Sequence, residues 1–224
     1  MELIRSFFDL ELLWDFRSRL FDGLLTTVEL AVVAFAVSLF PALLIALARS
    51  YGPRPLSVAL FVVVSMVRSL PAIVSVVFIF FALPFVGITL SAFLSVVSAV
   101  AVVQAIYLSE VFRGGLAAVD PGQFEAARAV GLRTGAALRR VILPQAAVVA
   151  APTFISANIQ LVQNTTIAVA VGLGDLLSTA LDIQTETGNP SALLAAALLY
   201  LLLLLPPLQL AKRYAARAAE RGVA

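Results

Sequence analysis

Polar side chains crowd one apolar stretch of the chain, residues 146–171, in a pattern that could bind a polar solute. Seven uncharged hydrogen-bonding residues lie within positions 156–166 of it: Ser156, Asn158, Gln160, Gln163, Asn164, Thr165 and Thr166. Because an α-helix repeats every 3.6 residues, Ser156 and Gln160 would share one face with Gln163 and Asn164, which follow Ser156 by seven and eight residues. A second apolar stretch contains Gln104 and Tyr107, about one helical turn apart.

Two readings of these polar residues stay open. Such side chains stabilise membrane bundles by hydrogen bonding between helices. Seven in a dozen residues is more than a bundle needs, which favours the lining of a solute pathway. The candidate pathway residues are Gln104, Tyr107, Asn158, Gln160 and Asn164.

Catalytic chemistry finds little support in the composition. The 224 residues include no cysteine and no histidine, so we predict no catalytic residue and no metal site. The single lysine, Lys212, does not follow a glycine-rich loop, which excludes ATP hydrolysis through a Walker A loop. The chain is 62% hydrophobic and 12% charged, against about 45–50% and about 25% in soluble domains. It is therefore predicted to be an all-α integral membrane protein.

Five apolar stretches approach the roughly 20 residues that a membrane-spanning helix needs. We predict spans at 28–48, 70–86, 88–109, 146–171 and 192–210. The apolar piece 56–67 is shorter and is followed by Arg68, so we expect it to lie near the interface. Dividing 56–86 into two spans would give six instead.

The distribution of Lys and Arg predicts the orientation, because cytoplasmic loops carry an excess of both. Eleven of the 15 basic residues follow the first span, lie between the third and fourth, or follow the fifth. The charged residues of the connection 172–190 are all acidic. We expect an extracytoplasmic amphipathic segment at 1–27, one transmembrane domain at 28–210 with a cytoplasmic loop at 111–145, and a basic cytoplasmic tail at 211–224.

The loop between the third and fourth predicted spans carries strong helix signals. Asp120 is a good N-cap, Pro121 suits the first helical position, and Gln123 has the capping-box spacing. These residues predict a helix over 121–130, which Gly131 would end in a left-handed conformation.

A second short helix should follow in the same loop, capped by Thr134 and stopped after Leu143 by Pro144. The alanines at 126, 127 and 129 would let another protein approach the first helix closely. Alternatively, the arginines of the loop would rest on anionic lipid headgroups. Glu110 is expected to pair with Arg113, three residues along.

The sequence EAARAVG, followed by VILPQA, resembles the EAA loop of ATP-binding-cassette (ABC) importer permeases of type I. The family pattern is EAA, three residues, Gly, nine residues, Ile, any residue and Leu-Pro. The matching residues are Glu125, Ala126, Ala127, Gly131, Leu143 and Pro144, with Val141 in the place of Ile. The resemblance extends over about residues 24–205.

GQFEAARAVG, AIYLSEVFRGG and RSLP are also similar to the polar amino acid group of these permeases. That group commonly has Leu-Leu-Lys-Asp-Thr-Ser-Leu after the loop, whereas this chain has Gln163-Asn164 in place of Lys-Asp. RSLP resembles methionine-type importers too, which also have five spans. The amino acid carried therefore stays open: polar or charged, for example glutamate, glutamine or a basic amino acid, or methionine.

The resemblance implies a non-catalytic transport subunit in the bacterial cell membrane. Two permease chains, identical or paralogous, would form the pathway. ABC ATPase subunits, which bind the ATP and Mg, would dock on the EAA loops, and an extracytoplasmic solute-binding protein would deliver the solute. Glu125 would contact the ATPase or orient the helices of the loop. Membrane lipid is expected as a partner and nucleic acid is not, and this chain itself would hold no cofactor.

Two other classes of protein are weaker alternatives. A stand-alone ion-coupled secondary carrier needs an ion site and usually an internal repeat, and no convincing repeat is found. A membrane-embedded enzyme would lack histidine, cysteine and a pair of carboxylates within the spans.

Overall fold

The computed structural model describes the backbone of residues 8–220 and the side chains of residues 8–213. The first seven residues of the expected N-terminal segment, Phe7 among them, and the last four of the basic tail lie outside the described residues. So do the side chains of 214–220, including Arg217. Every regular element within 8–220 is helical, which confirms the all-α prediction.

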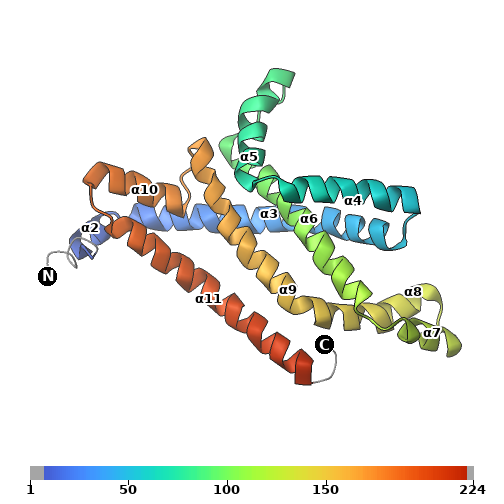
Figure 1. Ribbon diagram of the computed structural model, residues 1–224. Coiled ribbons are helices and arrows are strands. Elements are labelled where there is room, and N and C mark those ends of the chain that lie inside the picture. The colour runs from blue at the N-terminus through green and yellow to red at the C-terminus, as the bar shows by residue number, and fades with distance from the viewer. Residues whose placement is uncertain (1–7, 221–224) are drawn as a thin grey trace. The chain divides into compact units, whose positions relative to one another are not determined.

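The elements follow one another in the order shown in Figure 1. They are α2 (Leu10–Asp15), α3 (Arg17–Tyr51), α4 (Arg54–Ser69), α5 (Ala72–Val77), η1 (Phe78–Ala82), η2 (Leu83–Val86), α6 (Ala92–Ala117), α7 (Pro121–Ala129), α8 (Thr134–Ala137), η3 (Leu138–Ile142), α9 (Leu143–Asn164), η4 (Thr165–Val171), α10 (Leu176–Thr187) and α11 (Ser191–Glu220).

Four continuous helical stretches are long and apolar enough to cross a membrane: 17–51, 92–117, 134–171 and 191–213. A fifth is α4 together with 72–86, if this pair, bent by 98°, forms one broken span. Four of the five predicted spans are thus found as continuous helices, and the second requires both pieces of the bent pair.

The prediction for residues 56–86 is wrong in its boundary. Helix α4 runs through Arg68 to Ser69, and the break falls at Pro71 instead. A proline removes a backbone donor and pushes the preceding residue out of the helical region, so the helix ends before it.

Helix α3 begins at Arg17, well before the predicted span boundary at Val28. Residues 17–27 are therefore continuous with the first span. Of the described residues before them, Leu10–Asp15 form the separate helix α2, capped by the Asp9 carboxylate. That residues 1–27 lie outside the cell stays a prediction.

The chain divides into two compact units. The first unit comprises residues 1–37, 70–103 and 159–206. One of its apolar clusters is built on Leu30, Val96 and Val100, and a second joins Leu20 of α3 to Leu176 and Ile183 of α10. In Figure 1, α10 lies beside the first turns of α3. The Leu176 amide donates to the Thr27 hydroxyl there, at 3.0 Å.

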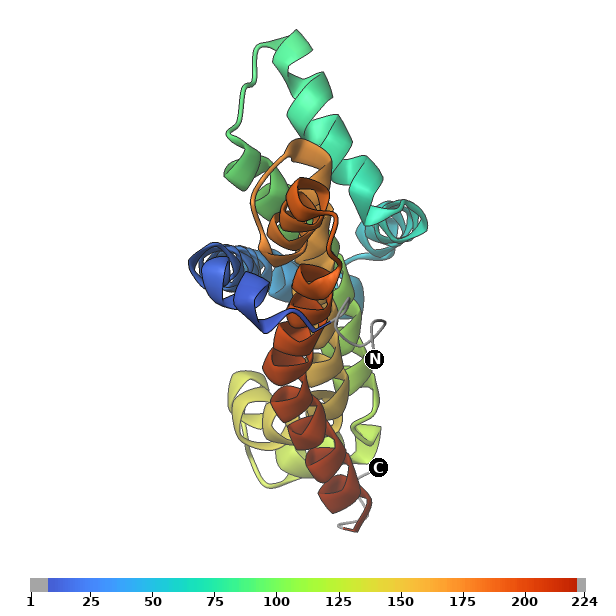
Figure 2. The ribbon, with the colours of Figure 1, turned by 90° about the vertical axis from the view of Figure 1, so that its left-hand side faces the viewer.

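The second unit comprises residues 38–69, 104–158 and 207–224. Within it, α7 and α8 form a helical hairpin between the end of α6 and the start of α9, as Figure 2 shows. Helices α6 and α9 meet very closely at Gly115. A Cβ atom on that residue would lie 2.8 Å from the Ala146 carbonyl oxygen.

Candidate functional site

Helix α7 carries the Glu-Ala-Ala sequence and begins much as predicted. Asp120 is its N-cap, and the carboxylate accepts a 2.7 Å hydrogen bond from the Gly122 amide. Pro121 occupies the first helical position, where no backbone donor is needed. The predicted capping box is wrong in one detail. The Gln123 side chain instead accepts a 3.3 Å bond from the Gln145 side chain.

The end of α7 confirms the role predicted for Gly131. Its φ of 85° is left-handed, a conformation that glycine adopts without steric cost. The Gly131 amide donates to the Arg128 carbonyl at 2.9 Å, and the Leu132 amide donates to the Ala127 carbonyl at 3.1 Å. This pair of bonds is a Schellman motif, which satisfies the last carbonyls of a helix and reverses the chain sharply.

The second helix of the hairpin differs from the prediction at both ends. Arg133, not Thr134, is the N-cap residue, with extended backbone and no capping side chain. Pro144 does not stop the helix but is the second residue of α9, which follows directly on the π-helical turn η3. A proline ring clashes with the carbonyl four residues earlier in a regular α-helix. The wider turn before Pro144 relieves that clash and keeps the helix continuous.

The hairpin presents a surface of small and charged residues to solvent. Ala127 is 5% exposed and anchors α7, whereas Glu125, Ala126 and Ala129 are exposed. Glu125 forms no ion pair with any side chain among residues 8–213, so its carboxylate is available to a partner. Leu143 and Pro144 are also exposed. An exposed helix of small residues with an unpaired carboxylate is an arrangement that suits docking of another protein.

A charged cluster lies at the base of this loop, near the end of α6. Glu110 accepts from Arg113 at 2.9 Å, which confirms the predicted pair. The structure adds Arg49, at the end of α3, as a second partner on the other carboxylate oxygen. The Arg49 side chain is 8% exposed and that of Glu110 is 21% exposed, so this ion pair is largely removed from water.

Arg49 connects three helices of the second unit. Besides its ion pair to α6, its guanidinium lies 5.5 Å from the Phe61 ring of α4. Its carbonyl also accepts a 3.1 Å bond from the Ser57 hydroxyl. Sequence reasoning missed this contact. A signal was present, because Glu110 is an isolated acid among basic residues and a buried carboxylate needs a cation.

The five predicted pathway residues are not joined by hydrogen bonds to one another within the described part of the chain. Gln104 is 2% exposed and its amide nitrogen has no protein partner there. The Arg68 guanidinium carbon lies over the Tyr107 ring, 5.5 Å from the ring centroid. Asn158 donates to its own helix, at the Phe154 carbonyl. Gln160 is exposed and Asn164 is half-buried. A common site for all five is therefore not established.

Asp175 forms a buried polar cluster in the first unit that the sequence reasoning did not identify. Its side chain is fully buried, caps α10, and accepts from the amide and the hydroxyl of Ser178 at 2.9 and 2.6 Å. The Tyr200 hydroxyl donates to its other oxygen at 3.3 Å. The sequence Asp175–Ser178 after a glycine is a helix-start signal that could have revealed it.

Long apolar helices and an exposed helical hairpin that carries the Glu-Ala-Ala sequence are the features expected of an ABC importer permease. The chain belongs to the family described as binding-protein-dependent transport system inner membrane component, which matches residues 38–219. Family membership identifies it as a membrane-embedded transport subunit.

Curated relatives support the same class. The chain is 34% identical over 185 residues to the probable glutamine ABC transporter permease protein GlnP of Bacillus subtilis (strain 168), covering 81% of this chain and 85% of that protein. It is 33% identical to the L-cystine transport system permease protein TcyB (76% and 75% covered) and 30% identical to the arginine transport system permease protein ArtQ (82% and 85% covered), both of the same organism.

Solved structures confirm the fold. A crystal structure of an amino acid ABC transporter with histidines matches with a TM-score of 0.83 at 29% identity, covering 92% of this chain and 96% of that one. An inward-facing form of the MetNI methionine ABC transporter matches at 0.70 with 21% identity, covering 96% and 99%. The second likeness concerns the fold alone.

Proposed function

We propose that this chain is the translocation subunit of an ABC importer for a polar amino acid, and that its α7–α8 hairpin couples uptake to ATP hydrolysis in a partner subunit. One observation carries the proposal. Four of the six motif residues, at 125, 126, 127 and 131, lie in a capped helical hairpin, and the other two, Leu143 and Pro144, begin α9. The acidic residue of the hairpin, Glu125, is exposed and has no ion-pair partner among the described side chains.

The coupling step follows from how the hairpin is held. Helix α7 is tied to α9 through Gln123 and Gln145, and the end of α6 is tied to α3 through Glu110 and Arg49. A displacement of the hairpin by the ATPase would therefore move the attached ends of these helices together as a rigid group, as in other domain closures. ATP and Mg would be bound by the ATPase, and this chain would supply no catalytic group.

Glutamine, cystine and arginine appear in the names of the relatives, which supports an amino acid as the solute. Gln104 supports a polar one, because a buried amide without a protein partner is costly unless water or a solute satisfies it. Gln163 and Asn164 carry no charge, which favours a solute whose side chain is neutral over one recognised by an ion pair at these positions.

The remaining partners and the orientation are part of the same proposal. A second permease chain, identical or paralogous, would complete the pathway, and a solute-binding protein would deliver the amino acid on the outside. The basic connection 111–145 would face the cytoplasm, and residues 172–190, which have no Lys or Arg, would face outward.

The test is uptake of labelled glutamine, cystine, arginine and methionine into membrane vesicles that contain the chain and its co-purifying subunits. Glu125→Lys reverses the charge offered to the ATPase, and Gly131→Asp puts a side chain at a left-handed position of the hairpin. Both should abolish ATP-driven uptake while the chain still inserts. Gly135→Ala is the matched control, since a Cβ there meets nothing within 4 Å.

Normal uptake by both variants would contradict the coupling role. Uptake that survives ATP depletion but collapses with the ion gradient would favour the secondary carrier instead. Unlabelled amino acids are then added as competitors, and the one that inhibits uptake of the labelled compound at the lowest concentration identifies the solute.

A further inference from the structure

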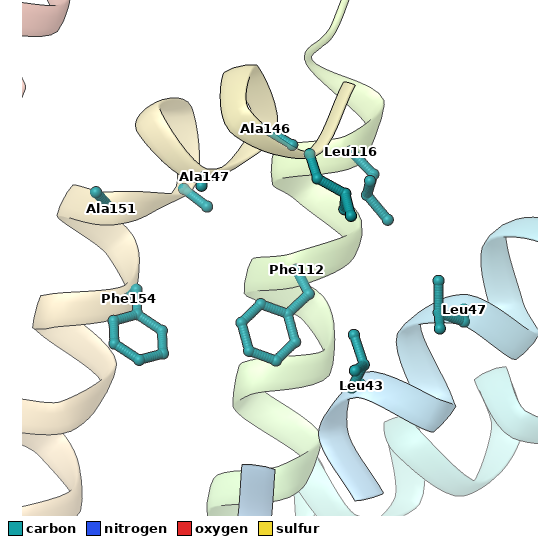
Figure 3. Close-up of a pocket in the computed structure, with 10 residues that line it drawn as sticks. Leu43, Leu47, Phe112, Leu116, Ala146, Ala147, Ala151 and Phe154 are labelled. Carbon is teal, nitrogen blue, oxygen red and sulfur yellow. The ribbon is translucent and has the colours of Figure 1, made fainter. Parts of the chain in front are cut away.

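An apolar groove lies in the second unit, apart from the polar residues considered above. It has a volume of about 430 Å³ and is formed by α3, α6, and α9 (Figure 3). Ten residues line it, and none has a polar side chain: Leu43, Leu47, Phe112, Leu116, Leu143, Ala146, Ala147, Ala150, Ala151 and Phe154. A polar amino acid would lose its hydration there without gaining a hydrogen bond, so the groove is not suited to the solute.

The shape of the groove fits an elongated apolar chain. Its α9 wall consists of small alanines between Leu143 and Phe154, spaced three and four residues apart on one helix face. At about 1.5 Å per residue this wall is about 16 Å long, close to half of the roughly 30 Å hydrocarbon core of a bilayer. The rings of Phe112 and Phe154, with centroids 6.2 Å apart, lie at one end of it.

Positive charge lies close to the Leu143 end of the groove along the chain. Arg139 and Arg140, in the turn η3, precede the lining residue Leu143 by four and three residues. Both arginines are exposed, and neither forms an ion pair with the side chains that the structure describes. Basic residues beside an apolar groove between membrane helices are the arrangement that binds anionic lipid headgroups.

We infer that this groove binds one acyl chain of an anionic phospholipid, whose phosphate is held by Arg139 and Arg140. The lipid would come from the leaflet that meets the basic loop. These arginines lie on the helical segment η3, which joins the hairpin to α9. The bound lipid would therefore stabilise the position of the hairpin relative to α9. The inference concerns lipid binding and stands whether or not the proposed solute is correct.

The experiment is native mass spectrometry of the full chain, purified with the subunits that accompany it, after equilibration with mixed micelles containing equal amounts of phosphatidylglycerol and phosphatidylcholine. The wild type should retain phosphatidylglycerol in preference to phosphatidylcholine. The double variant Arg139→Gln/Arg140→Gln should lower the retained phosphatidylglycerol at least about tenfold, because each basic residue contributes to headgroup binding. Ala147→Phe, which fills the groove, should lower it with both arginines intact.

Matched controls separate this site from general lipid contact. Arg54→Gln/Lys212→Gln removes two exposed cations that do not line the groove, and Val148→Phe adds the same ring to an exposed position of α9 off the groove. Both controls should retain phosphatidylglycerol as the wild type does.

Three results would overturn the inference. Equal retention of both lipids in the wild type would indicate ordinary annular lipid. Equal loss in the control variants would indicate a diffuse charge effect. A wild-type dimer that carries no lipid, but dissociates on Ala147→Phe, would assign the groove to a second copy of the chain.

Discussion

The first unit holds nine acidic and three basic residues, whereas the second unit holds four acidic and twelve basic residues. The division into units rests on packing alone, yet it separates the charges almost completely. Because basic residues are retained on the cytoplasmic side of a membrane, this difference supports the proposed orientation. In the proposed orientation, the hairpin and the C-terminal tail would lie on the side where an ATPase would dock.

Each unit also contains an Arg–Glu ion pair between two helices, and the two pairs differ in their exposure to solvent. Arg19–Glu186 in the first unit joins side chains that are 40% and 51% exposed, whereas Arg49–Glu110 in the second joins side chains that are 8% and 21% exposed. An exposed pair contributes little to stability, but breaking a buried pair leaves an uncompensated charge. The base of the hairpin should thus be far more sensitive to a single change than the α3–α10 contact.

Glu110→Leu should have the largest effect, because it leaves the Arg49 guanidinium buried without its counter-ion. We expect a loss of about 3 kcal/mol in the free energy of unfolding, measured by denaturant titration in detergent micelles. The double variant Arg49→Leu/Glu110→Leu should recover much of that loss. Equal stability of Glu110→Leu and the wild type would contradict the assignment of a buried pair.

Gly115→Ala should cost about 2 kcal/mol, because the added methyl group meets the Ala146 carbonyl oxygen and the Ala150 side chain at 2.8 Å. The neighbouring Gly114→Ala is the control. Its Cβ meets nothing within 4 Å, and alanine should stabilise the helix there by up to about 1 kcal/mol. Thermal unfolding should therefore move in opposite directions for adjacent positions, and a shared direction would refute the close approach of α6 and α9.

Asp175→Ala tests the buried polar cluster of the first unit. It removes the N-cap of α10 and the acceptor of the Ser178 and Tyr200 hydroxyls, so we expect a loss of about 1–2 kcal/mol in the same titration. Asp175→Asn retains an oxygen that caps the helix and should lose less. The cluster would have no stabilising role if both variants unfolded as the wild type does.

Glu186→Gln should have the smallest effect, and one that depends on pH. The hydrogen bond from Arg19 holds the pKa of the Glu186 carboxyl below its usual 4.5. The pair therefore stabilises the fold fully above that usual pKa and stops doing so as the pH falls through the lowered value. The wild type should unfold at a slightly higher temperature than Glu186→Gln at pH 7, with no difference once the carboxyl is protonated. A difference that grows toward low pH would have the wrong sign.

Much of the fold could be predicted because the signals were local. Long apolar runs predicted the spans, and Asp120, Pro121 and Gly131 predicted the boundaries of α7, since capping depends on the nearest few residues. The failures at Arg68 and Pro144 have different causes. The charge of Arg68 was taken as a boundary, although a charged residue can lie within a helix, and α4 ends before Pro71 instead. A proline stops a helix or lies within its first turn according to the geometry of the turn before it, which the residue type does not specify.

The site was less predictable because its contacts join distant residues. Glu110 and Arg113 are three residues apart and were found, whereas Arg49 reaches Glu110 only through the packing of α3 against α6. The groove was also missed, because its leucines, alanines and phenylalanines are the same residue types that line any apolar helix face.

The central claim is that the α7 face of the hairpin contacts the ATPase, and cysteine cross-linking in native membranes tests it most directly. The chain has no cysteine of its own, so a single introduced thiol reports on one position. Ala126→Cys is exposed on α7 and should cross-link to the ATPase subunit through a short bifunctional reagent, whereas Ala127→Cys, one residue along and buried, should not. The claim would be contradicted if Ala126→Cys gave no ATPase cross-link while a cysteine at exposed Thr185, in α10, did.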